Sequence, residues 1–185
     1  MPGAAFELGD SVALHPIEDE DHEFVQYGRN HPDVRVPLTD TTIRSVDDVA
    51  AMLEDDDYHF LICVDDPETT TGYGPEDGPE PVGVVAFAYV SSPGERGSLM
   101  YWVAPEHQGN GYVTEAAELF LAYAFRECGF HKVSARVTES NEASVAVLEN
   151  LGFVREGTRR QSSLVDGEYE DMYNYGLLAE EWLGN

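Results

Sequence analysis

The chain has 185 residues, 42% of them hydrophobic, and its 36 acidic against 10 basic residues give a formal net charge of −26. This length suits one domain spanning residues 1–185, and the apolar fraction is enough for a core, which excludes global disorder. No apolar run approaches the ~20 residues of a membrane helix, and no basic stripe is present to meet phosphates, so we expect neither membrane insertion nor direct nucleic-acid binding.

The first half of the chain is predicted to mix strands and helices. Apolar spacing places strands at 11–17, 58–64, 82–90 and 97–103, and helices at 18–30 and 45–55. The segment 65–81 is dense in Asp, Glu, Gly and Pro, which is typical of an exposed, mobile loop. The SSPGER segment between the last two strands is typical of a hairpin connection.

The second half of the chain continues this alternation. The predicted elements are a helix at 111–128 ended by Gly129, a strand at 132–137, a helix at 141–153 capped by Asn141, and two strands within 154–178. Asp166 and Gly167 form a hairpin signal between the last two strands. Helices interleaved with strands in this way predict a mixed α/β fold.

The stretch HQGNGYVTEA (107–116) places two glycines where a strand gives way to a helix. Such glycines either form a turn or admit a phosphate, because a helix N-terminus carries unpaired N–H groups that favour anions. A Walker loop requires a lysine that is missing here, and the dinucleotide fingerprint requires glycine where Thr114 stands. The (Arg/Gln)-x-x-Gly-x-(Gly/Ala) loop of acetyl-CoA-dependent N-acetyltransferases matches residues 108–113, except that Val113 replaces a small residue.

In this context the chain resembles a GNAT-superfamily N-acetyltransferase, and within that superfamily the Rim-type ribosomal-protein N-terminal acetyltransferases. The phrases YWVAPEHQGNGYVTEA, ESNEASVAVLENLGF and DGEYEDMYNYGLLAEEW carry the resemblance, which spans nearly the whole chain and is strongest from Leu99 to Trp182. It implies a single-domain α/β fold whose central, mostly antiparallel twisted sheet has six to seven strands flanked by helices. The acidic segment 65–81 looks like a loop insertion without a clear counterpart.

The resemblance implies acetyl-CoA as cosubstrate, and we expect no metal. Backbone N–H groups of residues 108–113 would form a nest for the pyrophosphate, which explains why no lysine or arginine is needed there. In the family, strand backbone groups at 101–103 pair with the pantetheine amides and Asn141 bonds the cofactor arm, although N-capping alone also explains Asn141. The implied cofactor-binding residues are Tyr101, Trp102, Val103, Gln108, Gly109, Asn110, Gly111, Tyr112, Val113, Asn141 and Ser144.

Acetyl transfer needs a neutral amine, a stabilised oxyanion and a proton for the leaving thiolate. The backbone N–H of Trp102 or Val103 is the candidate that polarises the thioester carbonyl. The resemblance implies Ser144 as the proton donor; the alternative is a first-turn hydroxyl that satisfies backbone groups. Glu139, at the end of a strand, is the candidate base acting through water, and an exposed loop acid is the alternative. His107 is expected to be a loop histidine.

The acid-rich composition, with Lys132 as the only lysine, resembles that of cytoplasmic proteins from extreme halophiles. The acids are scattered through every segment, which favours this interpretation over a protein that binds cations or basic partners; molar salt would screen the repulsion among them. Cys63 and Cys128 stand far apart in apolar surroundings, as expected of reduced thiols in a cytoplasm. The N-terminus lacks the basic and apolar regions of a signal peptide.

We therefore expect an enzyme that moves an acetyl group from acetyl-CoA to a primary amine by direct attack. Rim-type similarity favours a protein N-terminus as acceptor, while an amino sugar, a polyamine or an amino acid stays open. Two other classes also stay open: a non-catalytic module that binds acyl-CoA, and an acidic interaction protein that uses the fold as a scaffold. The oligomeric state is open between a monomer and a homodimer.

Overall fold

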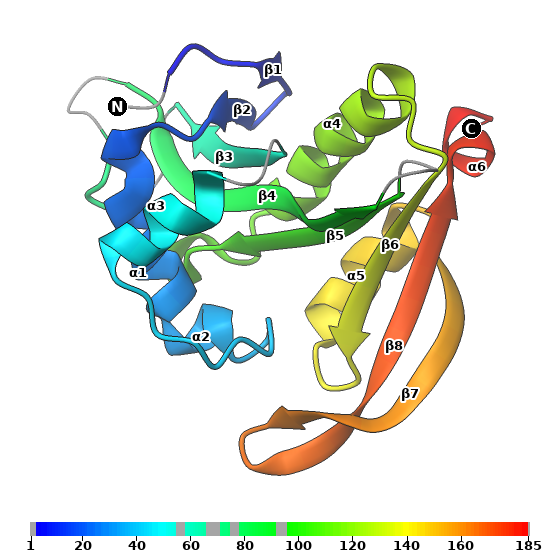
Figure 1. Cartoon of the computed structure of the whole chain (residues 1–185). Helices are drawn as coiled ribbons and strands as arrows, with labels where there is room; N and C mark the ends of the chain where they lie inside the picture. The colour runs from blue at the N-terminus through cyan, green and yellow to red at the C-terminus, as the bar shows by residue number, and fades with distance from the viewer. Residues whose placement is uncertain (1–2, 55–57, 66–70, 75–77, 92–95, 185) are drawn as a thin grey trace. The chain divides into compact units, whose positions relative to one another are not determined.

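The structure is a computed structural model that describes residues 3–54, 58–65, 71–74, 78–91 and 96–184. Its strands are β1 (Glu7–Leu8), β2 (Ala13–Pro16), β3 (His59–Val64), β4 (Glu80–Ser91), β5 (Arg96–Val103), β6 (Lys132–Thr138), β7 (Val154–Val165) and β8 (Glu168–Leu178). Its helices, labelled in Figure 1, are α1 (His22–Asn30), α2 (Pro32–Arg35), α3 (Val46–Glu54), α4 (Tyr112–Arg126), α5 (Glu142–Asn150) and α6 (Ala179–Leu183), with 3-10 turns η1 (Asp19–Asp21) and η2 (Pro105–His107).

The strands of the described residues form one eight-stranded sheet in the order β1-β2-β3-β4-β5-β6-β8-β7. Strands β5 and β6 run parallel, with 96–98 opposite 132–134, whereas the pairs β1–β2, β2–β3, β3–β4, β6–β8 and β7–β8 are antiparallel. The predicted mixed α/β fold with a mostly antiparallel sheet flanked by helices is therefore confirmed. Strand β1 and helix α2 were not predicted, because two and four residues are too short to show a period.

The described chain divides into two compact units. The first comprises Met1–Arg35, Thr41–Ala86 and Tyr101–Leu119, and the second comprises Val36–Asp40, Phe87–Met100 and Phe120–Asn185. Strands β4 and β5 and helix α4 each contribute residues to both units. The single domain expected from the length remains a prediction, and the two units are described separately.

In the first unit, two glycines leave space for the large, buried side chain of Trp102 at the end of β5. Phe24 of α1 packs against this indole with ring centroids 5.3 Å apart. A Cβ at Gly28 of α1 would lie 2.1 Å from the indole, and a Cβ at Gly83 of β4 would lie 2.3 Å from the Trp102 carbonyl oxygen. Two glycines thus allow helix and strand to approach a tryptophan that is only 4% exposed.

The loop expected at 65–81 is only partly exposed, and of it the structure describes Asp65, 71–74 and 78–81. Glu80 already belongs to β4 and is 5% exposed, so the expectation of an exposed loop is wrong at this end. Its carboxylate accepts hydrogen bonds from the Thr71 N–H and hydroxyl and from the Gly72 N–H. A buried carboxylate requires such partners, and they tie 71–72 to the start of β4.

In the second unit, β7 and β8 form a long hairpin, α5 lies beside β6, and α6 follows β8 (Figure 1). Val165 pairs with Glu168, so Asp166 and Gly167 form a two-residue turn with φ of 48° and 86°. Positive φ at both positions is the geometry that an Asp-Gly pair favours. The SSPGER connection, in contrast, lies largely outside the described residues.

Candidate active site

The glycine-containing loop at 108–113 joins η2 to α4 within the first unit. Gly109 and Gly111 have φ of +86° and +82°, conformations that glycine adopts without the penalty of a side chain. A Cβ built at either position would meet no atom within 4 Å, so the space above both residues is open. The loop therefore has both features that a backbone site for an anion requires: left-handed glycines and an unobstructed approach.

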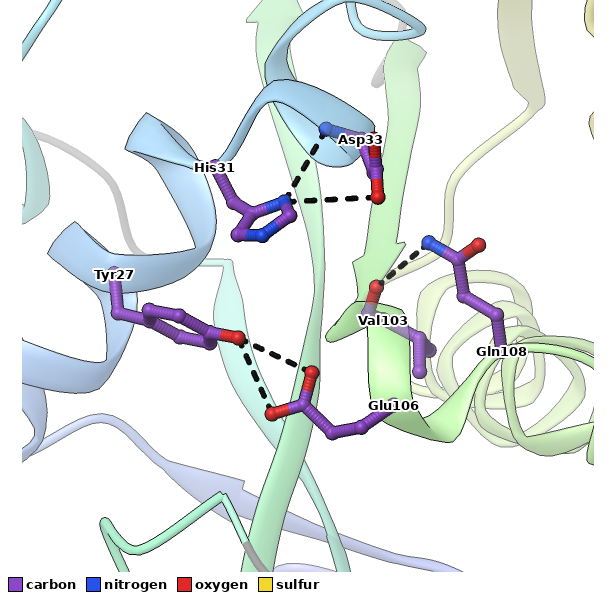
Figure 2. A network of polar contacts seen from close by, with 6 residues as sticks. All are labelled: Tyr27, His31, Asp33, Val103, Glu106 and Gln108. Carbon is purple, nitrogen blue, oxygen red and sulfur yellow. Dashed lines mark hydrogen bonds and ion pairs between the residues drawn. The ribbon is translucent and has the colours of Figure 1, made fainter.

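Two side-chain amides of this loop, those of Gln108 and Asn110, donate hydrogen bonds to backbone carbonyls of preceding residues. Gln108 Nε2 donates to the Val103 carbonyl at 3.3 Å, which Figure 2 shows, and Asn110 Nδ2 donates to the His107 carbonyl at 3.1 Å. Helix α4 begins at Tyr112, and its first recorded backbone bonds are those of Thr114 and Glu115 to the Gly111 carbonyl. Among the described residues, no backbone acceptor is recorded for the N–H groups of 109–113, so these donors remain for a ligand.

The first unit holds both 101–103 and 108–113, and the roles expected of these residues stay predictions. Ala104 N–H donates to the Val82 carbonyl at 2.8 Å, which fixes the end of β5 against β4. Val103 is 5% exposed, and its carbonyl accepts the Gln108 side chain, which ties the loop to the end of β5. The remaining predicted site residues, Glu139, Asn141 and Ser144, lie in the second unit.

Asn141 and Ser144 meet at the start of α5. The Asn141 side-chain oxygen accepts the Ser144 backbone N–H at 3.1 Å, so Asn141 is the N-cap residue, as its position predicts. Ser144 contributes only its backbone to this cap. Its hydroxyl is not part of this capping bond, and both alternatives for the hydroxyl stay predictions.

Glu139 follows β6 and belongs to a small cluster that the sequence does not reveal. Its N–H donates to the Asp171 carbonyl of β8 at 3.0 Å. Desolvation, and then a hydrogen bond to the Glu139 carboxylate, raise the pKa of the Tyr173 hydroxyl, so this hydroxyl keeps its proton at neutral pH. The Arg155 guanidinium lies 3.3 Å from the centroid of the Tyr173 ring. Glu139 is exposed, but it has a defined partner.

A second cluster, also missed from the sequence, lies in the first unit and is drawn in Figure 2. The Tyr27 hydroxyl of α1 contacts both carboxylate oxygens of Glu106 of η2, at 3.2 and 3.1 Å. Burial first, and then the hydrogen bond to Glu106, raise the pKa of Tyr27, so the hydroxyl stays protonated and donates. One turn further along α1, His31 Nδ1 accepts the Asp33 N–H at 3.2 Å. The i, i+4 spacing of Tyr27 and His31 was the only sequence signal for this cluster.

Two residues close to Glu106 in sequence carry buried side-chain nitrogens. The Trp102 indole nitrogen and His107 Nε2 are buried and have no hydrogen-bond partner within the described ranges. His107 is 2% exposed, so it is not a loop histidine open to solvent. Its ring lies 6.5 Å from that of Tyr112 at the start of α4, which packs η2 against the helix that follows the loop.

No group of three or more potential metal ligands is found in the part of the chain that the structure describes. In the same residues, no helix has the length and hydropathy to cross a membrane. The free cysteines are Cys63, which is buried, and Cys128, which is partly exposed.

A family model described as the acetyltransferase (GNAT) domain matches residues 11–154. The chain belongs to the GNAT acetyltransferase family. The assignment makes acetyl-CoA-dependent N-acetyltransferase the enzyme class of this GNAT domain and acetyl-CoA its cosubstrate, which agrees with the geometry of the 108–113 loop.

Among the relatives of this GNAT domain, "Putative ribosomal N-acetyltransferase YdaF" of Bacillus subtilis (strain 168) is 33% identical over 102 residues, which are 55% of this chain and 56% of that protein. The match thus spans little more than half of that relative. Spermidine N(1)-acetyltransferase of Escherichia coli (strain K12) is 25% identical over 184 residues, 94% of this chain and 89% of that protein. The structure of spermidine N-acetyltransferase from Vibrio cholerae in complex with CoA and spermine aligns with a TM-score of 0.80 at 21% identity, over 95% of this chain and 99% of that one, which shows a shared fold.

Proposed function

We propose that this GNAT protein transfers an acetyl group from acetyl-CoA to a primary amine by direct attack of the neutral amine. The observation that carries the proposal is the 108–113 loop, with two left-handed glycines, unpaired backbone N–H groups and open space above both glycines. A loop that only turned the chain would need neither two open positions nor free donors at a helix start. These features fit a pyrophosphate, because backbone donors and the helix dipole favour an anion there.

When bound, acetyl-CoA supplies the acetyl group as a thioester. We assign its pyrophosphate to the N–H groups of 109–113 and its pantetheine arm to the backbone of 101–103. Asn141, which the family resemblance places on the cofactor arm, uses its side-chain oxygen for the cap of α5, and its amide NH₂ group remains the donor available for such a contact.

The backbone N–H of Val103 is the better of the two candidates for polarising the thioester carbonyl. Ala104 N–H donates to the Val82 carbonyl of β4, and N–H groups alternate in direction along a strand. The Val103 N–H therefore points away from β4, whereas the Trp102 N–H points toward it. A fixed donor of this kind stabilises the charge that develops on the carbonyl oxygen.

Ser144 is the proposed proton donor to the leaving thiolate, and Glu139 the proposed base for the amine. Asn141 supplies the side-chain oxygen that caps α5, and Ser144 contributes its backbone N–H to that cap. Glu139 is proposed to act through water, and its backbone N–H is fixed by a hydrogen bond to the Asp171 carbonyl. A hydroxyl is a weak acid, so Ser144 passes its proton to the thiolate as it takes another from water.

Two acceptor classes compete, a protein N-terminus and a small amine. The partial similarity to YdaF favours the first. The similarity to a spermidine N(1)-acetyltransferase, which covers 94% of this chain, favours a polyamine. We place the enzyme in the cytoplasm of an organism that accumulates salt, because its charge of −26 requires screening and its cysteines are free.

Turnover on a panel of amines in molar potassium chloride tests this proposal, with thiol release as the readout. The panel holds a ribosomal-protein N-terminal peptide, spermidine, an amino sugar and an amino acid. We expect one class to be turned over at least tenfold faster than the others. Binding of acetyl-CoA without turnover of any amine would identify a non-catalytic acyl-CoA module instead, and failure to bind acetyl-CoA would identify an interaction scaffold.

A further inference from the structure

Four aromatic side chains and one carboxylate form a continuous group in the first unit, which we call the Tyr27 cluster. It consists of Phe24, Tyr27, His31, Tyr73 and Glu106. The ring centroids of Tyr27 and Tyr73 are 5.4 Å apart and stacked, those of Phe24 and Tyr73 are 5.8 Å apart, and those of Tyr27 and His31 are 5.8 Å apart. The Glu106 carboxylate lies at the hydroxyl end of Tyr27 (Figure 2).

The cluster is buried at one end and open at the other. Phe24 is 1% exposed and rests on the buried indole of Trp102. Tyr73, in contrast, is 38% exposed, and Glu106 is exposed as well. Ring faces and a carboxylate are therefore accessible from solvent above a fixed apolar base.

The charge of Glu106 is not balanced by a cation. Its recorded partner is the Tyr27 hydroxyl, a neutral donor, and no ion pair of Glu106 is found within the described residues. The carboxylate attracts an ammonium group through a charge-assisted hydrogen bond, and the nearby tyrosine rings add attraction where the cation reaches a ring face. Because the Tyr27 hydroxyl donates to Glu106, the carboxylate is oriented before any ligand arrives.

The position of Glu106 along the chain links this cluster to the 108–113 loop. Glu106 stands two residues before Gln108, whose side chain is bonded to the Val103 carbonyl in the same unit, and Figure 2 shows both contacts together. An ammonium held by Glu106 thus lies in the same unit as the backbone assigned to the thioester arm. The exposed part of the Tyr73 ring, which packs on the buried Phe24, provides an apolar surface for the methylene groups of an alkyl chain.

We propose that Glu106, Tyr27 and Tyr73 bind one end of the acceptor as an ammonium group, and that this acceptor is an unbranched alkyl diamine whose other, neutral amine takes the acetyl group. The inference rests on the proposed function, since it assigns the acceptor site of that reaction. The carboxylate fixes the ammonium at the hydroxyl end of Tyr27, and Tyr73, stacked on the Tyr27 ring, holds that ring in place. A neutral amine or a branched acceptor would lose one or both of these contacts.

The test compares Glu106→Gln with Glu118→Gln, using 1,4-diaminobutane as the probe amine. Glu118 is an exposed acid of α4 in the same unit, so this control removes one negative charge without touching the cluster. Glu106→Gln should raise the KM for 1,4-diaminobutane about tenfold, as expected from loss of a hydrogen bond to a charged group, with the KM for acetyl-CoA unchanged. Tyr27→Phe, which keeps the ring and the Glu106 charge, should raise the amine KM less.

A second readout separates this site from the proposed reaction. Calorimetry with 1,4-diaminobutane and free coenzyme A measures amine binding without turnover. Binding by the wild type and by Glu118→Gln but not by Glu106→Gln supports the site even if no acetyl group is transferred, in which case the proposed function alone fails. Equal amine KM or Kd for the Glu106 and Glu118 variants overturns the site, and turnover by both variants then leaves the proposed function standing.

Discussion

At the scale of single residues, the start of α5 allows the cap to be tested separately from the chemistry that we propose for Ser144. Asn141 supplies the capping oxygen and Ser144 supplies the backbone N–H that it receives, at 3.1 Å. Replacing serine by alanine keeps that N–H. A stability loss and a rate loss can therefore be assigned to different residues of the same turn.

Ser144→Ala should lower kcat and kcat/KM together, by at least about tenfold on a good amine, because general acid catalysis typically contributes about 10²–10⁴-fold. Its melting temperature and acetyl-CoA affinity should stay close to wild type. Asn141→Ala is the matched control: loss of the cap should destabilise the protein by about 0.5–2 kcal/mol. Steady-state kinetics and thermal melts measure both effects. A wild-type kcat for Ser144→Ala would make the serine structural and leave water as the proton source.

At the scale of elements, the loop between η2 and α4 allows a sharp test because both of its glycines face open space. A side chain at Gly111 meets no neighbour, so a substitution there has two separable effects. One is the backbone cost of a left-handed conformation, about 1–2 kcal/mol for a residue with a Cβ. The other is the attraction or repulsion between the new side chain and an anion bound at the start of α4.

Gly111→Glu should lower acetyl-CoA affinity more than about a hundredfold, because a carboxylate placed beside a pyrophosphate costs several kcal/mol. Gly111→Ala carries the same backbone cost without the charge and should keep most of the affinity. Gly167→Glu adds the same charge at another left-handed glycine with open space, in the β7–β8 turn, and should bind normally. Titration calorimetry with acetyl-CoA measures the affinity of each of the three variants. If Gly111→Glu and Gly111→Ala bind equally well, the two glycines serve the turn alone.

Local pattern carries enough information for most elements and for the glycine loop, but not for contacts made across the chain. The Asp166–Gly167 turn, the Asn141 cap and the Gly111 entry to α4 each depend on a few adjacent residues, and all are present. The Tyr27–Glu106 bond joins residues 79 positions apart, and no local period marks it. The buried Glu80 likewise depends on hydrogen-bond partners at 71–72. The residues next to Glu80 in sequence give no sign of these partners.

At the scale of the whole molecule, the formal charge of −26 comes from acidic residues spread through every segment. The only lysine, Lys132, pairs with Glu156 on the surface of the second unit. Many exposed acids have no basic neighbour in the described residues; Glu118, Glu168 and Glu180 are examples. Repulsion among such groups is long-ranged in dilute buffer and opposes the compact state.

The melting temperature should therefore rise by about 10 °C between dilute buffer and molar potassium chloride, or about 3–5 kcal/mol for a chain of this size. Most of the rise should come below about 1 M, where the Debye length has fallen to about 3 Å and further salt adds little screening. A variant carrying Glu118→Gln, Glu168→Gln and Glu180→Gln should start higher and rise less, because fewer charges remain to be screened. Scanning calorimetry of both proteins across the salt series measures this. A melting temperature that stays level in salt, or two parallel curves, would show that charge repulsion does not limit this fold and would remove the argument for a salt-accumulating host.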